Sequence, residues 1–121
     1  MIYFRKGIMK IDRLAVYNRY SGHCAYCGKL ITLSTMQIDH IVPKARGWKV
    51  SDVNDMSNTN PSCRSCNLYK RNHSLEGFRK KYLGMLHLRL AKQFTVKIAI
   101  DYGIVKLEKW NGVFWFEKVK G

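Results

Sequence analysis

The alternation of apolar and polar positions divides the chain into short elements. Between residues 8 and 20, apolar side chains recur at mostly three- and four-residue steps, with basic residues between them. This spacing is typical of an amphipathic helix, because positions three and four apart lie on the same helix face. The sequence therefore predicts a short helix over residues 8–20 that ends at Gly22.

Residues 30–42 form an apolar stretch rich in β-branched side chains, and Pro43 follows it directly. Because polar residues interrupt the stretch in the middle, we expect two short strands, with Asp39 and His40 in the second. The composition then turns polar, and it predicts a long ordered loop over residues 44–60 that Pro61 closes.

Helical spacing dominates the next part of the chain. Residues 67–71 predict one or two helical turns. Ser74 is a suitable N-cap for a longer helix, whose apolar positions recur at helical spacing as far as Leu90. Residues 94–102 fit either a helix or a strand, and we favour a helix that Gly103 caps.

A β-hairpin is predicted at the C-terminal end. Val105 and Leu107 alternate with charged residues, and apolar side chains return in residues 113–119. Asn111 and Gly112 lie between the two segments and favour the left-handed backbone conformations of a tight hairpin turn.

The charge of the chain is strongly unbalanced. The 22 Lys and Arg exceed the 8 Asp and Glu and give a formal net charge of +14, so the expected partner is a polyanion, nucleic acid above all. Apolar residues make up 46%, which supports a folded core and excludes a disordered basic tail. A chain of 121 residues has room for one compact domain. It shows neither an 18-residue apolar run nor a secretory signal pattern, so we expect a cytoplasmic protein.

The four cysteines form two Cys-x-x-Cys pairs, Cys24 with Cys27 and Cys63 with Cys66. In a reducing compartment this pairing favours four thiolates around one structural zinc ion. Two disulfides or a redox dithiol are the alternative interpretations, but neither accounts for two separate turns of this kind. Gly28 follows the first pair and suits a turn with positive φ.

A second group of polar residues is placed around these pairs. Asp39 and His40 lie in a predicted strand, Asn58 precedes the second cysteine pair, and Asn67 follows it directly. Taken singly, each is more often an ordinary surface or turn residue. If one zinc ion joins the pairs, however, a carboxylate, an imidazole and an amide are brought together. Such a group suits phosphodiester hydrolysis, with a hard divalent ion on oxygen ligands and an imidazole that accepts a proton from water.

These residues together resemble the HNH endonucleases of the ββα-metal superfamily, in the form with a four-cysteine zinc site. The resemblance covers about residues 13–80 and rests on Cys24-Ala-Tyr-Cys27-Gly28, Ile38-Asp39-His40-Ile41-Val42-Pro43, Asn58, and Cys63-Arg-Ser-Cys66-Asn67 followed by Lys70. It implies an α+β fold with a small ββα-metal core held by the zinc site. A helix would flank this core on the N-terminal side, and a helix and the β-hairpin on the C-terminal side. One nuclease domain would span residues 1–121, with an extension from about residue 81.

The resemblance also implies roles for the matching positions. His40 would be the general base that activates water, and Asn58 would brace the loop and orient His40. Asp39 and Asn67 would hold a catalytic Mg²⁺ or Mn²⁺. Asn67 stands where many members carry a final His, so the chain resembles the His-Asn-Asn variant; His73 is a less suitable replacement ligand because of its spacing. The implied reaction is hydrolysis of DNA, by nicking or double-strand cleavage, to a 5′ phosphate and a 3′ hydroxyl.

Four basic residues flank the predicted site in the sequence and are candidates for phosphate contacts: Lys44, Arg46, Lys70 and Arg71. RNA fits the charge as well as DNA does. The rival function is a noncatalytic zinc module that binds nucleic acid through charge alone. Asp39, His40 and Asn67 argue against this rival, because neither zinc binding nor phosphate attraction requires them. Compact members of the family are often phage-encoded or mobile-element enzymes, which favours such an origin here.

Overall fold

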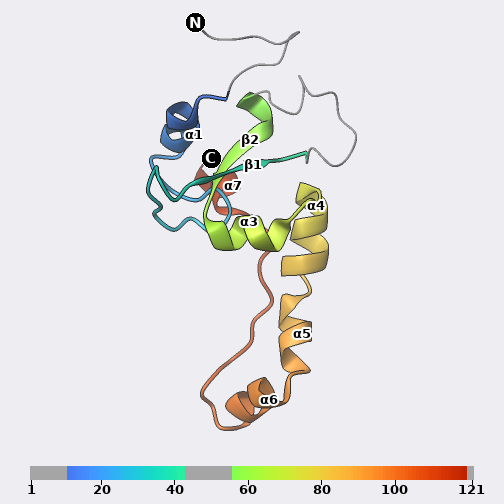
Figure 1. Ribbon diagram of the computed structural model, residues 1–121. Helices are drawn as coiled ribbons and strands as arrows, with labels where there is room; N and C mark the ends of the chain where they lie inside the picture. Colours follow the sequence, from blue (N-terminus) through green and yellow to red (C-terminus); the bar gives the residue numbers. More distant parts are fainter. Residues whose placement is uncertain (1–10, 43–55, 120–121) are drawn as a thin grey trace, which may run out of the picture. The chain divides into compact units, whose positions relative to one another are not determined.

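The computed structural model describes residues 11–42 and 56–119 (Figure 1). In chain order the elements are α1 (Arg13–Arg19), β1 (Gln37–His40), η2 (Met56–Asn58), β2 (Thr59–Ser62), α3 (Arg64–Lys70), α4 (Leu75–Gly77), η3 (Phe78–Leu83), α5 (Leu86–Ala91), α6 (Phe94–Asp101) and α7 (Trp115–Val119). These elements form a small α+β fold. None of the described helices is long and apolar enough to cross a membrane.

The chain divides into two compact units. Unit 1 takes in the described residues up to Leu75 and again from Phe114 onward, and unit 2 is the segment Glu76–Val113. Unit 1 contains both cysteine pairs and both strands, and it is therefore the part of the fold that positions the predicted site.

Unit 1 is built on an antiparallel pair of strands, β1 and β2, whose register places Gln37 opposite Ser62 and Asp39 opposite Asn60. All four residues of β2 are buried. Helix α1 lies against β2, and Asp12 is its N-cap, whose carboxylate accepts a hydrogen bond from the Ala15 amide at 3.2 Å. The chain then enters α3 directly from β2, so β1, β2 and α3 form the expected ββα core.

The end of the chain returns to unit 1 and covers the first cysteine pair. The amide of Trp115 donates to the Tyr26 carbonyl at 3.1 Å, and the amide of Phe116 donates to the Ala25 carbonyl at 2.8 Å. The rings of Phe114 and Phe116 both form T-shaped contacts with the ring of Tyr26, and their centroids lie 5.3 and 6.0 Å from its centroid. This packing supplies aromatic core that the short strands alone lack.

The predicted C-terminal β-hairpin is wrong. The stretch 104–114, all of it described, contains no strand. Residues 115–119, which were expected to lie in the second strand, instead form α7. Local turn signals at Asn111 and Gly112 favoured a hairpin, whereas burial of Phe114 and Phe116 against the first cysteine pair decides the outcome. Tertiary packing therefore overrides the local pattern here.

Unit 2 is helical, but its first helix is shorter than expected. The predicted long helix is interrupted after η3, where the Gly84 amide donates to the Arg79 carbonyl at 2.9 Å in a wide turn. A Cβ atom at Gly84 would lie 2.8 Å from the Lys80 carbonyl oxygen, so this wide turn requires glycine. The helix favoured for residues 94–102 is confirmed as α6, and Gly103 follows it with φ +72°.

Two further expectations in unit 1 need correction. The first of the two strands predicted in residues 30–42 is absent from that described stretch, since Thr32 and Thr35 close a turn through their side-chain oxygens, 2.8 Å apart. The second is confirmed as β1. Strand β2 was not predicted, because its sequence is polar and includes Pro61. The helices predicted at residues 8–20 and 67–71 are confirmed as α1 and α3, although the part of the first before residue 11 lies outside the described residues.

Candidate functional site

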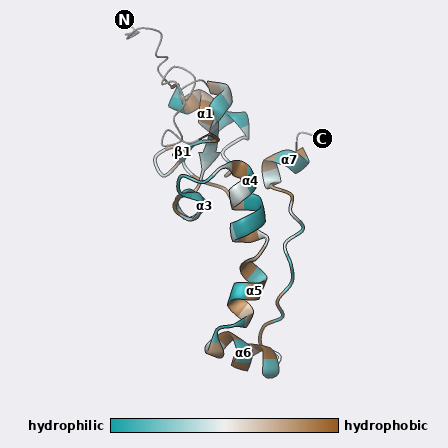
Figure 2. Ribbon diagram, turned by 90° about the vertical axis from the view of Figure 1, so that its right-hand side faces the viewer, coloured by the Kyte–Doolittle hydropathy of each residue, from teal (hydrophilic) through white to brown (hydrophobic). Residues whose placement is uncertain are grey.

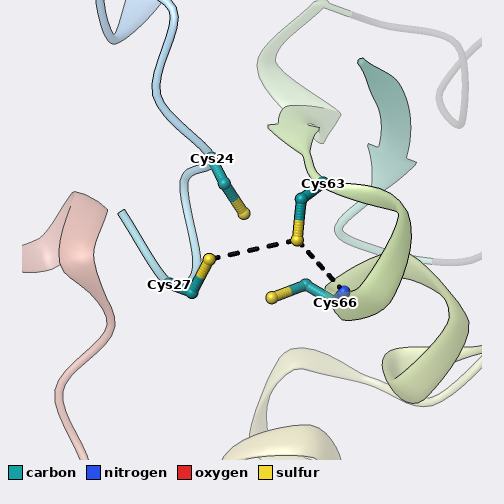
Figure 3. Close-up of side chains that lie close together, drawn as sticks. All are labelled: Cys24, Cys27, Cys63 and Cys66. Carbon is teal, nitrogen blue, oxygen red and sulfur yellow. Dashed lines mark hydrogen bonds between the residues drawn. The ribbon is translucent and has the colours of Figure 1, made fainter. Parts of the chain in front are cut away.

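The two cysteine pairs meet in unit 1. Their four Sγ atoms lie within 4.8 Å of one another. Figure 3 shows the side chains pointing toward a common centre, Cys24 and Cys27 from the turn after α1 and Cys63 and Cys66 from the start of α3. The Cys27 and Cys63 sulfurs are 3.9 Å apart, close to the edge of about 3.8 Å that Zn–S bonds of about 2.3 Å produce in a tetrahedron. The number, kind and spacing of these donors fit a structural zinc ion.

Each pair is shaped by backbone hydrogen bonds. In the first turn, Gly28 donates to the Cys24 carbonyl at 2.9 Å, and the Cys24 amide donates to the Lys29 carbonyl at 2.8 Å. Gly28 has φ +83°, as the sequence predicts. In the second turn, Cys63 is the N-cap of α3 and its sulfur accepts from the Cys66 amide at 3.3 Å. The helix start and the metal-binding turn are therefore the same structure.

The pKa values of the thiols show why a cation suits this cluster. A hydrogen bond from Cys66 lowers the pKa of Cys24 to about 4. The same bond raises the pKa of Cys66, and burial raises the pKa of Cys27. Without a metal ion the cluster thus favours a thiolate at Cys24, which the Cys66 thiol stabilises. A divalent cation is needed to hold all four sulfurs deprotonated.

Asp39 lies on β1 with its side chain only 4% exposed and both carboxylate oxygens engaged. The Tyr26 hydroxyl donates to Oδ2, and the Lys70 ammonium lies 3.2 Å from Oδ1. Burial raises the pKa of Asp39, while the positive charge of Lys70 opposes that effect. Asp39 is an oxygen donor of the kind that Mg²⁺ or Mn²⁺ prefers, but it already has a cationic partner.

Lys70, at the last position of α3, is fully buried. Besides Asp39, its ammonium donates to the His40 carbonyl oxygen at 3.1 Å. The phosphate contact that the sequence predicts for Lys70 stays a prediction, because in this structure its ammonium is buried and paired with Asp39. Lysine carries a strong preference for water, so burial of the whole side chain requires the paired carboxylate. Lys70 thus joins α3 to β1 at the predicted site.

His40 ends β1 and is half-buried. The backbone beyond it is fixed by Asn58, whose Oδ1 accepts from the Val42 amide at 2.8 Å and whose Nδ2 donates to the Val42 carbonyl at 3.1 Å. The Ile41 amide also donates to the Asn58 carbonyl at 2.8 Å. Asn58 therefore braces the segment that follows His40.

Asn67 is half-buried and lies three residues before Lys70 on α3. Positions three apart share one helix face, so Asn67 lies toward the side of α3 from which Lys70 reaches β1. Arg71 follows the helix and is exposed, as a phosphate contact requires. The other two candidates for phosphate contacts, Lys44 and Arg46, lie outside the described residues.

The sequence did not single out Tyr26 or Asn60, which also surround Asp39. Tyr26 is buried at 4% exposure, and Asn60, opposite Asp39 in the strand register, donates to its hydroxyl at 3.4 Å. Burial and the nearby Asp39 charge raise the pKa of Tyr26, so the hydroxyl is protonated and donates to the carboxylate. The position of Tyr26 inside a Cys-x-x-Cys turn was the available signal, because that turn is held close to β1.

Comparisons with known proteins agree with these motifs. Residues 24–83 match the family model described as HNH endonuclease. The chain is 35% identical to the CRISPR-associated endonuclease Cas9 of Corynebacterium diphtheriae, over 49% of this chain and 6% of that protein. The crystal structure of the Type II-C Cas9 enzyme from Actinomyces naeslundii has a similar fold, with a TM-score of 0.50 and 24% identity over 80% of this chain and 11% of the other. The chain thus matches a small part of each of these longer proteins.

Proposed function

This chain belongs to the HNH endonuclease family through residues 24–83, and on that premise we propose that it is a metal-dependent endonuclease that hydrolyses phosphodiester bonds in DNA. The observation that carries the proposal is the junction of β1 and α3 beside the four-cysteine cluster. There, Asp39, His40 and Lys70 are linked by hydrogen bonds, and Asn58 fixes the next segment of the chain.

His40 is the general base in this proposal. Lys70 donates a hydrogen bond to the His40 carbonyl, and Asn58 holds the residues after it. The backbone position from which the imidazole extends is therefore fixed. A neutral imidazole accepts a proton from water as the water oxygen bonds to phosphorus. The bond from phosphorus to the O3′ atom breaks, and a solvent proton completes the 3′ hydroxyl while the phosphate stays on the 5′ side. No covalent enzyme intermediate is needed.

Asp39 and Asn67 are the proposed ligands of a catalytic divalent ion. They supply one carboxylate oxygen and one amide oxygen, and such hard donors favour Mg²⁺ or Mn²⁺. When bound, the ion neutralises charge on the phosphate and on the leaving oxygen. The four cysteines hold a structural zinc ion, so the two metals have separate tasks.

The nucleic acid is proposed to bind through positive charge. The net charge of +14 and the exposed side chain of Arg71 support this, and Lys44 and Arg46 stay predicted contacts. Binding through phosphates releases counterions and should therefore weaken steeply with added salt. The charge does not distinguish DNA from RNA, and both polymers belong in the assay.

A plasmid nicking assay tests the proposal. The zinc-loaded chain is incubated with supercoiled DNA and Mg²⁺ or Mn²⁺, with and without EDTA, and in parallel with a labelled RNA. We expect nicking that EDTA abolishes and that His40→Ala removes while DNA binding persists. His87→Ala in α5 is the matched control and should nick as the unaltered chain does. Tight DNA binding without cleavage under every ion condition would instead establish the noncatalytic zinc module.

A further inference from the structure

Lys70 is a buried cation placed against the proposed metal ligand Asp39. We infer that Lys70 acts as a resident counter-ion, whose ammonium a divalent ion must displace from Asp39 before the ion can bind there. The inference rests on the proposed function and concerns how the same site acquires its ion. Lys70 is accordingly a positioning residue that sets the affinity of the site for divalent ions.

The contacts of Asp39 leave no direct access to its carboxylate. One oxygen accepts from Tyr26, and the other lies 3.2 Å from the Lys70 ammonium. The exposed fractions of the two paired side chains are 0% for Lys70 and 4% for Asp39. A hydrated Mg²⁺ keeps several water molecules, so it does not fit beside Asp39 while both partners are in place.

Of the two partners, Lys70 is the one that a cation would displace. Tyr26 is neutral, and its ring is fixed by edge contacts with Phe114 and Phe116. Lys70 is joined to α3 by four flexible carbons and carries the same sign of charge as the arriving ion. Repulsion between the ammonium and a divalent cation at one carboxylate is strong in a buried site.

The displaced ammonium also needs a new partner. Its other contact, the His40 carbonyl oxygen at 3.1 Å, carries only a partial charge. A phosphate group of the substrate supplies a full negative charge at the proposed site, whereas water alone must otherwise solvate an ammonium taken from the interior. The site should therefore bind its ion weakly in the free protein, because Lys70 is retained until the substrate arrives.

The test measures Mn²⁺ binding directly, by electron paramagnetic resonance of the free ion, in the zinc-loaded full chain without nucleic acid. Lys70→Met removes the competing charge and should tighten Mn²⁺ binding by roughly tenfold or more. Because Lys70→Met leaves a buried carboxylate unpaired, Lys70→Gln is measured beside it. The glutamine keeps an N–H donor for Asp39 without the charge and should tighten binding in the same direction.

Lys80→Met is the matched control, because it removes one positive charge from a side chain that is 74% exposed and should leave Mn²⁺ affinity unchanged. Unchanged or weaker binding in both folded Lys70 variants would overturn the inference. The nicking assay on the same samples keeps the two claims separate. Nicking by the unaltered chain without tighter ion binding in the variants would reject the counter-ion role alone. Tighter binding in a chain that never nicks would support the counter-ion and reject the nuclease.

Discussion

The hydroxyl of Tyr26 donates a hydrogen bond to the carboxylate of Asp39, which links the first cysteine turn directly to β1. Tyr26 is one of the two residues between Cys24 and Cys27, so a residue of the proposed zinc turn also orients a proposed ligand of the catalytic ion. The cysteine turn and the proposed catalytic site thus share a buried side chain. Changes in the zinc turn should accordingly alter the hydrogen bonding of Asp39.

Replacement of Tyr26 by phenylalanine removes this link while it keeps the ring. We expect Tyr26→Phe to lower the free energy of unfolding by about 1.5–3 kcal/mol, because a buried hydrogen bond to a charged group is lost. Urea unfolding measures the change. Tyr17→Phe is the control, since its hydroxyl donates to the Ile31 carbonyl at 2.9 Å away from Asp39. Only Tyr26→Phe should alter the Mn²⁺ concentration needed for nicking; an equal response of both variants would contradict the link.

Gly28 is predicted to be more sensitive to substitution than Gly22, the other described glycine of unit 1. It has φ +83°, and a Cβ atom there would lie 2.3 Å from Cδ1 of Trp115. Gly28→Ala should lower the free energy of unfolding by at least about 3 kcal/mol, because the backbone is strained and the Trp115 ring is displaced. Gly112→Ala is the matched control: its φ is +84°, but nothing lies within 4 Å of the added carbon. Gly112→Ala should lower the free energy of unfolding by only about 1–2 kcal/mol. Thermal unfolding that ranks the two equally would show that the Trp115 contact is unimportant.

Removal of the structural metal should unfold unit 1. We expect one zinc ion per chain, and loss of the cooperative unfolding transition after chelation or in Cys63→Ser, because zinc contributes much of the stability of so small a core. Metal content and circular dichroism measure both effects. A folded, active Cys63→Ser protein would refute the zinc scaffold.

Zinc affinity should fall as the pH is lowered. The pKa values of Cys27 and Cys66 are raised in the metal-free cluster, so these thiols carry protons that zinc must displace. Protons compete with the metal, and binding therefore strengthens as the pH rises from about 6 to about 8. Competition titrations with a zinc chelator across this range measure the trend, and a pH-independent affinity would contradict it.

Asn58 should affect the rate of cleavage more than the binding of DNA. Asn58→Ala removes both hydrogen bonds to Val42 and frees the segment after His40, so we expect nicking to slow by roughly ten- to a hundredfold. Asn58→Asp keeps the acceptor for the Val42 amide, so its nicking rate should lie between those of the unaltered chain and Asn58→Ala. Single-turnover nicking and DNA-binding titrations separate the effects. Equal losses in rate and binding would place Asn58 in the DNA contact rather than behind His40.

The parts of the fold that the sequence predicts are those with strong local signals. The cysteine spacing, the glycine after the first pair and the strand with Asp39 and His40 depend on neighbouring residues, and the structure has them as expected. Strand β2 was not predicted, because its own residues have little tendency to form a strand. It forms through its pairing with β1. A partner distant in sequence decides such an element.

Lys70 shows the same limit for the candidate site. Nothing in its sequence neighbourhood distinguishes it from the exposed Arg71, and both were expected to contact phosphate. Its burial follows from a carboxylate 31 positions earlier in the chain, which the cysteine cluster and the strand pair bring into reach. Charge patterns count basic residues without telling which of them are already neutralised inside the fold.

Unit 2 begins and ends within unit 1, since the chain leaves after Leu75 and returns at Phe114. Many of its apolar side chains are exposed, among them Phe94, Tyr102 and Ile104 at 76–77%, and Figure 2 shows brown residues on α6. Both cysteine pairs, both strands and the aromatic residues that cover them belong to the other unit. Replacement of this inserted segment would therefore leave every residue of the cysteine cluster and of the strand pair unchanged.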